Sequence, residues 1–261
     1  MIHLLSSEWL RTKRTAVRWI VFCLPVAFAA LIIAYMMLRD APTQQFAFQV
    51  FFEAWTAFII PLGVGVIPAF IVHEEELAGG FCGFLSTDTP RYKLYMGKFI
   101  LLFLFLSIST LIATFAFCTG IRVSIPGGVS NIMFMAAAIL VIFATLPLLA
   151  LHLWVSFAWG MGASIGVSIS GLLLAALVGT TSLGDKIWLF IPWAWPSRLA
   201  KLPGTYLELS AGMMAPPEAI SSGLVFRELT QGTIAVTVCF VVALAGGIIW
   251  FNRWESRKCY E

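Results

Sequence analysis

The stretch IVHEEELAGGFCGFLSTDTPRYKLYMGKF occupies residues 71–99 and separates two long apolar segments. Three consecutive glutamates, Glu74, Glu75 and Glu76, follow the first apolar segment, and the second begins at Phe99. The chain is only 11% charged, and this is its densest acidic cluster. The pattern predicts two membrane-spanning helices joined by a polar connection that lies outside the membrane.

The composition of the whole chain also indicates a membrane protein. Of its 261 residues, 60% are hydrophobic, and the mean hydropathy is +0.94. Soluble domains carry about a quarter of charged residues, so the charge deficit excludes a soluble domain. The net charge of +3 is modest and no basic tract is present, which argues against nucleic-acid binding. The five cysteines form no CxxC pair and indicate neither a metal site nor a disulfide framework.

Six segments contain the roughly 20 apolar residues that a helix needs to cross the hydrocarbon core of a bilayer. These segments are residues 19–38, 54–72, 99–118, 132–153, 162–182 and 233–251. Backbone in contact with lipid must satisfy its own hydrogen bonds, so each segment is expected to be helical. The sequence therefore predicts an all-α integral membrane protein with a single transmembrane domain over residues 1–261.

Lysine and arginine are distributed unequally between the two sides of the predicted membrane. They are enriched in cytoplasmic loops of membrane proteins. One side carries Arg11, Lys13, Arg14, Arg18, Arg91, Lys93, Lys98, Arg253, Arg257 and Lys258. The short connections on the other side carry only Arg39 and Arg122. Both termini and residues 73–98 are therefore predicted to be cytoplasmic, and residues 183–231 are predicted to form a long outer loop.

The N-terminal residues 1–16 are predicted to form an amphipathic helix. One face carries apolar residues at the spacing i, i+3, i+7 and i+8, namely Ile2, Leu5, Trp9 and Leu10. Basic residues lie beside this face, a pattern typical of a helix that lies on the cytoplasmic leaflet. A frayed terminus is the alternative.

The stretch contains parts of a metal-binding motif and of a nucleotide-binding motif, but each lacks a required residue. His73 and Glu74 begin like the HExxH motif of zinc proteases, but Leu77 stands where the second histidine is required. Lys98 follows a glycine as in a phosphate-binding P-loop, but Phe99 replaces the required serine or threonine. We therefore expect no enzyme activity, no metal site and no nucleotide site in this chain.

Residues 74–86 fit an amphipathic helix instead. Its apolar stripe consists of Leu77, Phe81, Phe84 and Leu85 at the spacing i, i+4, i+7 and i+8. The stripe is expected to pack on the bundle or on lipid, and the edge with Glu75 and Glu76 is expected to face the cytosol. Thr89 and Pro90 then suit the start of the next helix. The alternative is a solvated turn whose charges only set the topology.

This architecture resembles the permease of an ABC-2 type exporter. In that family the connection between spans two and three reads roughly E-x-x-x-G-T, then a leucine pair, a proline with a basic residue, and a lysine that opens span three. In this chain residues 76–80, 84–85, 90–91 and 97–98 take these places. Phe81 replaces the threonine. In this respect the chain resembles the lantibiotic-immunity branch of the family, whose permeases carry an aromatic residue in a similar run.

The resemblance implies that residues 74–90 form a coupling helix seated in a groove of a separate ABC ATPase subunit. The implied contacts are Glu74, Glu75, Glu76, Gly79, Gly80, Phe81 and Arg91. It also implies ATP and Mg²⁺ on the partner ATPase, no cofactor on this chain, and a second permease that forms a homodimer or heterodimer with it. The implied cargo is a lantibiotic-type peptide, expelled from the lipid bilayer of a bacterial plasma membrane.

A second unusual stretch is KIWLFIPWAWPSRLAKLPG, residues 186–204, which is rich in tryptophan and proline. It predicts short helices that fold back into the outer leaflet between spans five and six. The resemblance to ABC-2 permeases implies that this re-entrant segment forms part of an exit gate, with Trp193, Trp195 and Arg198 as outer-gate contacts to substrate. An aromatic belt at the membrane interface is the alternative.

Small residues recur along the fifth predicted span. They are Gly160, Gly162, Ser164, Gly166, Ser168 and Ser170. Small residues at four-residue spacing allow helices to approach closely in membranes. We expect close packing of this span, either within the bundle or against a second permease.

Charges on the predicted outer side are balanced, six against six. The acidic residues are Asp40, Glu53, Asp185, Glu208, Glu218 and Glu228, and the basic residues are Arg39, Arg122, Lys186, Arg198, Lys201 and Arg227. No field of either sign therefore steers a charged substrate. The span interiors carry almost no charge, which argues against ion-coupled transport. Export of a drug, lipid or polysaccharide stays open, as does a membrane scaffold that transports nothing.

Overall fold

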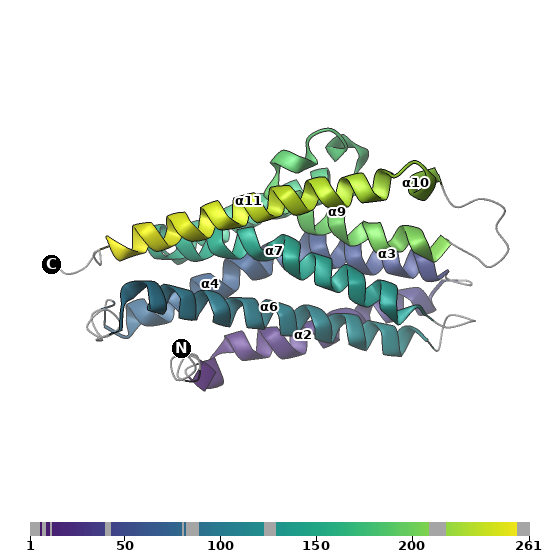
Figure 1. Cartoon of the computed structure of the whole chain (residues 1–261). Helices are drawn as coiled ribbons and strands as arrows, with labels where there is room; N and C mark the ends of the chain where they lie inside the picture. The colour runs from purple at the N-terminus through teal and green to yellow at the C-terminus, as the bar shows by residue number, and fades with distance from the viewer. Residues whose placement is uncertain are drawn as a thin grey trace.

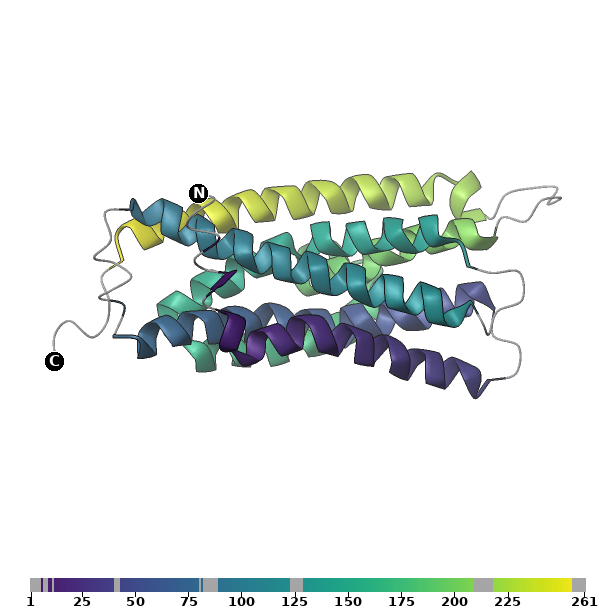
Figure 2. The ribbon, with the colours of Figure 1, turned by 90° about the horizontal axis from the view of Figure 1, so that it is seen from below.

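The computed structural model describes residues 6, 9–10, 12–39, 43–79, 81, 89–122, 129–208 and 218–254. Within these ranges all regular structure is helical, as the sequence predicts. Six helices in this part of the chain are long and apolar enough to cross a membrane, which confirms the predicted number of spans. They run along a common axis (Figure 1, Figure 2).

The spans follow one another in a simple order. They are α2 (Ala16–Met37), a continuous helix made of α3 (Gln44–Ala54), η2 (Trp55–Ile59) and α4 (Ile60–Leu77), then α6 (Arg91–Ile121), α7 (Asn131–Trp159), α8 (Met161–Leu174) with its continuation η3 (Ala175–Gly179), and α11 (Leu224–Asn252).

The second span extends beyond its predicted limits at both ends. α3 begins at Gln44 rather than at residue 54, because the Thr43 side chain caps it by accepting a hydrogen bond from the Phe46 N–H at 3.2 Å. At the other end α4 continues through the three glutamates to Leu77. Hydropathy marks only the apolar part of a span, whereas the helix itself continues into polar sequence.

The π-helical segment η2 lies directly before Pro61. Proline has no backbone N–H, so in a regular α-helix the carbonyl of Ala57 would lose its partner at position 61. In η2 the N–H of Ile60 donates instead to the carbonyl of Trp55, five residues earlier. This shift from four-residue to five-residue hydrogen bonds lets the helix continue through the proline. Such π-helical segments occur frequently at functional sites.

Both described ends of the chain lie at the same end of the bundle (Figure 1). The segment η1 (Thr12–Arg14), the Leu77 end of α4, the Arg91 end of α6 and the Asn252 end of α11 are all found there. We call this the proximal end and the opposite end the distal end. The segments that the sequence assigns to one side of the membrane are thus found together.

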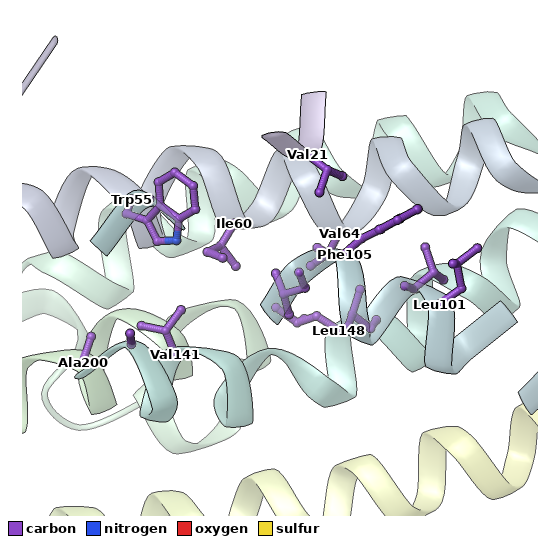
Figure 3. Packing of buried hydrophobic residues seen from close by; sticks show 14 of the residues in the cluster. Val21, Trp55, Ile60, Val64, Leu101, Phe105, Val141, Leu148 and Ala200 are labelled. Atoms are coloured by element: carbon purple, nitrogen blue, oxygen red, sulfur yellow. The ribbon is translucent and has the colours of Figure 1, made fainter. Parts of the chain in front are cut away.

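Helix α7 lies at the centre and packs against α4, α6 and α11. α2 packs mainly on α6, whereas α4 packs mainly on α8 and α7. Figure 3 shows buried side chains of the core, among them Val64, Phe105 and Leu148, in the space between these helices. Aromatic rings fill much of it: Phe51 stacks on Phe117 with ring centroids 4.4 Å apart. Such packing stabilises a bundle in lipid, where burial from water contributes little.

Small residues join α4 to α8, as expected for the fifth span. A Cβ atom added at Gly65 would overlap the side chain of Ser168, so the two helices meet here at close range. The Ser164 hydroxyl donates to the Gly65 carbonyl at 2.9 Å, and the Ser168 hydroxyl donates to the Pro61 carbonyl at 3.0 Å. The close packing within the bundle is therefore confirmed. Gly162 and Gly166 lie on the other, exposed face of α8.

Beyond η3 the chain turns through short helical segments and then continues towards the distal end. They are η4 (Ser182–Gly184), η5 (Trp188–Phe190), η6 (Pro192–Ala194), α9 (Trp195–Lys201), η7 (Leu202–Glu208) and α10 (Glu218–Ser221). Figure 1 shows the first of these projecting from the side of the bundle, whereas α9 lies between α11 and α3. The predicted end of the long loop at residue 231 is wrong, because α11 already begins at Leu224.

Half of the predicted helix 1–16 lies outside the described residues. Trp9 and Leu10 are helical, but residues 12–14 form the 3-10 turn η1. Trp9 packs against Phe105 with ring centroids 5.4 Å apart, and the Arg18 guanidinium lies 4.9 Å above the Trp9 ring. Trp9 therefore contacts the bundle itself, and the interfacial helix stays a prediction.

Candidate functional site

The three glutamates of the opening stretch form the last turn of α4 at the proximal end. They do not start a separate helix, so this part of the prediction for residues 74–90 is wrong. Residues 80 and 82–88 lie outside the described residues, and a helix over that part stays a prediction. The helical phase of Glu74 to Glu76 is consequently set by the second span.

Glu75 faces into the bundle and is paired with Lys98 of α6. The Lys98 Nζ lies 2.8 Å from the Glu75 Oε1, and the two side chains are 1% and 7% exposed. Glu75 lies in phase with Ile71 and Val72, which are buried on the same face. The expectation that Glu75 faces the cytosol is therefore wrong.

Leu77 shows the same reversal. It was expected on a stripe that packs on the bundle or on lipid; it does not pack on the bundle and is 74% exposed. Because α4 continues through this turn, Leu77 falls on the outer face when Glu75 falls on the inner face. Glu74 and Glu76 remain half-buried, and the Glu76 Oε2 lies 3.3 Å from the His73 Nδ1. Of the predicted acidic contacts, these two are the ones that reach the surface.

The chain leaves α4 through a turn with unusual backbone angles. Gly79 has a φ of +125° and Phe81 has a φ of +68°; Gly80 lies outside the described residues. A positive φ is uncommon for a non-glycine residue. Phe81 is held there by packing, with its ring centroid 5.0 Å from Trp254 and 6.1 Å from Phe157. The expected packing of Phe81 on the bundle is confirmed.

Arg91 connects the start of α6 to the end of α11. Its Nη1 donates to the carbonyls of Trp254 at 2.7 Å and Asn252 at 3.3 Å. A positive charge at these carbonyls complements the negative end of the α11 dipole. The N-cap of α6 is Pro90, so the helix begins one residue later than predicted.

An aromatic cluster completes the proximal end. Phe157 of α7 contacts Phe251 at a centroid distance of 4.9 Å, and Tyr95 of α6 lies 5.4 Å from Phe251. A Cβ atom at Gly247 would overlap the Tyr95 ring and hydroxyl, so α11 and α6 meet closely here. Together with Glu75–Lys98 and Arg91, this cluster ties α4, α6, α7 and α11 into one unit.

Sequence reasoning missed most of this cluster. Lys98 was noted only in motif comparisons and in the count of cytoplasmic charges, although a lysine with apolar residues on both sides is itself a signal of a paired buried charge. No local pattern connects Phe157, Phe251 and Trp254, because they meet only when α7 and α11 pack.

The predicted outer-gate residues are fixed within the bundle. Arg198 donates to the Val178 carbonyl from Nε at 3.1 Å and from Nη2 at 2.9 Å, and to the Thr181 carbonyl at 2.6 Å. Its Nη1 also donates to the Asp185 Oδ1 at 2.6 Å. Arg198 thus caps the end of the helix formed by α8 and η3.

The two tryptophans are likewise engaged. Trp195 is buried and its Nε1 donates to the Leu189 carbonyl at 3.2 Å. Trp193 lies over Gly171 of α8, where a Cβ atom would overlap the indole. These three residues therefore shape the distal half of the bundle, and a contact with substrate stays a proposal.

A second ion pair near this segment was not anticipated. The Lys201 Nζ lies 2.9 Å from the Glu53 Oε1, and Gln49 donates to the same carboxylate oxygen at 3.1 Å. Glu53 thus lies within a helix and not beside the first outer loop. Within the described ranges, no group of three or more His, Cys, Asp or Glu side chains is arranged to hold a metal ion.

Comparison with known protein families identifies the chain. Residues 4–183, more than half of the 261, match the family described as ABC-2 family transporter protein. A comparison with curated proteins finds no match. The six spans and the match agree on a multi-pass membrane protein. The chain therefore belongs to the ABC-2 family of transporter proteins, whose membrane permeases have no catalytic domain and leave ATP hydrolysis to a partner subunit.

Proposed function

We propose that this permease exports lantibiotic-type peptides from the membrane and protects a bacterial cell against them. The support is the resemblance of residues 76–98 to the connection in lantibiotic-immunity permeases, with Phe81 in place of the usual threonine. Six helices enclose little space, so a second permease, identical or different, completes the path. Both termini and the proximal end lie in the cytoplasm, in agreement with the excess of lysine and arginine there.

The proximal end receives the motion of the ATPase. The observation that carries this proposal is the Glu75–Lys98 ion pair, which joins the last turn of α4 to α6 at 2.8 Å. ATP binding closes the ATPase dimer and moves the segment that follows α4. The ion pair and the aromatic cluster pass this motion to α6, α7 and α11. Glu74 and Glu76, which reach the surface beside this segment, contact the ATPase.

Export of another amphipathic molecule, such as a drug, a lipid or a polysaccharide, is the second candidate. The observation that favours it is the pairing of distal charges. Asp185 is paired with Arg198 and Glu53 with Lys201, so each of these two carboxylates already has a cationic partner within the chain.

Inhibitory concentrations measured on matched strains distinguish the two candidates. One strain expresses the permease with its ATPase, and the other lacks only the permease. We expect the permease to raise the inhibitory concentration of cationic lantibiotics and to leave that of neutral drugs unchanged. Protection against neutral amphiphiles alone would replace the first candidate by the second. Protection against neither, with the complex intact, would contradict both.

A further inference from the structure

A narrow apolar cleft separates two packing groups of the bundle. Because α2 packs on α6 while α4 packs on α8 and α7, α2 and α4 touch only sparsely. Between them lies a cavity of about 210 Å³, lined from α2, η2, α4, α6 and α7. Its floor includes Ile60, Val64 and Leu102, which are buried, and its rim includes Leu24 and Leu62, which are more than one-third exposed.

The lining of the cleft is apolar along its whole length. Apart from the Trp55 indole, the one polar side chain among the lining residues is Ser109. A closed apolar cavity of about 150 Å³ stays dry and binds small hydrocarbons. A polar or charged ligand would lose its hydration here and would find only the Ser109 hydroxyl and the Trp55 Nε1–H, a buried donor with no partner in the described structure, as polar groups of the lining.

The shape of the cleft is elongated. Its lining follows the second span from Trp55 to Ile67, which corresponds to about 18 Å at a rise of about 1.5 Å per residue. A volume of about 210 Å³ spread over this length leaves a cleft too narrow for a helix, whose diameter with side chains is about 10 Å. Figure 3 shows Val21 of α2 and Val64 of α4 directed into this region between the helices.

We propose that this cleft binds one linear acyl chain of a membrane phospholipid, which enters sideways from the bilayer. The exposed rim at Leu24 and Leu62 lies within the spans, where the surrounding medium is hydrocarbon. The chain runs parallel to the helices, as bilayer chains do, and replaces the missing contacts between α2 and α4. The inference is independent of the cargo and does not require the proposed function.

Gly63 is a position from which a larger side chain would fill the cleft. It lines the cavity, and a Cβ atom there would meet nothing within 4 Å. A phenylalanine at this position would therefore occupy the cleft without displacing protein atoms near the backbone. Gly162 offers a matched control, since it also lies on a membrane-spanning helix with nothing within 4 Å, but it does not line the cavity.

Photolabelling of the full chain with its ATPase in liposomes tests the proposal. The liposomes contain a trace of phosphatidylcholine with a diazirine in the middle of one acyl chain, and adducts are located by mass spectrometry. We expect the strongest labelling at residues 59–67 and 102–109. Gly63→Phe should reduce it about tenfold, the factor that corresponds to about 1.4 kcal/mol, whereas Gly162→Phe should not. Thermal unfolding of both variants verifies that they fold, and Gly63→Leu replaces Gly63→Phe if needed.

Labelling of the cleft no stronger than that of the exposed faces of α8 and α11 would overturn the proposal. Unchanged labelling in the folded Gly63 variant would overturn it as well.

Discussion

The ammonium group of Lys98 lies 2.8 Å from the carboxylate of Glu75, and both side chains are buried between α6 and α4. Each charge is expensive to bury alone, and each is stabilised by the other. The pair therefore holds the ends of two spans together at the end of the bundle where an ATPase subunit is expected to bind.

Removal of one member of this pair should destabilise the permease. We expect Lys98→Met or Glu75→Leu alone to lower the free energy of unfolding by roughly 3–5 kcal/mol, because an unpaired buried charge remains. The double variant should recover most of that loss, since both charges are gone. Thermal unfolding in detergent measures all three. Single variants as stable as the original protein would show that the charges are not buried together.

Loss of Arg91 should loosen the end of α11. Arg91→Ala removes the donor to the Asn252 and Trp254 carbonyls, and the expected loss is about 1–2 kcal/mol. Hydrogen exchange at residues 250–254 should accelerate by about tenfold for each 1.4 kcal/mol lost, while exchange in α8 should not change. Arg91→Lys keeps the charge and should retain part of the protection. Equal exchange in all variants would exclude the capping role.

Enlargement of Gly65 should separate α4 from α8. Gly65→Ala places a Cβ atom against the Ser168 side chain and the Ser164 carbonyl, and overpacking of this kind costs roughly 1–3 kcal/mol. Ser168→Gly in the same chain should relieve the overlap. Gly63 lies two residues before Gly65 on the same helix, and a Cβ atom there would meet nothing within 4 Å, so Gly63→Ala serves as the control. If thermal unfolding finds the two alanine variants equally stable, α4 and α8 do not pack as closely at Gly65 as the structure shows.

Arg198 should matter far more than its ion-pair partner. Arg198→Met leaves the carbonyls of Val178 and Thr181 without their donor, and we expect a loss of roughly 2–4 kcal/mol. Asp185 is 61% exposed, so Asp185→Asn should have little effect, as surface ion pairs usually do. Unfolding temperatures of the two variants provide the comparison. A larger effect of Asp185→Asn would contradict the capping role of Arg198.

The spans were predictable because apolar runs of this length have one solution in a bilayer, a helix that satisfies its own hydrogen bonds. The extent of the second span was not, since hydropathy does not register that Thr43 caps α3 or that α4 continues through Glu74 to Leu77. Where α4 ends determines which of the three glutamates faces into the bundle. A helix started at residue 74 places Glu75 outside, whereas a helix continued from residue 60 places it inside.

Contacts between distant segments were also beyond the sequence. Lys98 pairs with Glu75 across 23 positions, and Arg198 reaches the Val178 carbonyl across 20. Backbone carbonyls carry no sequence signal, so the partners of Arg198 could not be inferred from residue types. The gate role of Arg198 was implied only by the resemblance to ABC-2 permeases and stays a proposal, whereas its capping of the helix formed by α8 and η3 became visible only in the structure.

The amount of ATPase that co-purifies with the tagged permease tests the central claim most directly. The claim is that the ATPase binds the proximal end beside Glu74 and Glu76, the half-buried glutamates of α4. We predict that Glu76→Lys strongly reduces the co-purified ATPase, while Lys186→Glu, a charge reversal on an exposed residue between η4 and η5, leaves it unchanged. Both variants should unfold at the temperature of the original protein. Full retention of the ATPase by the folded Glu76→Lys variant would contradict the claim.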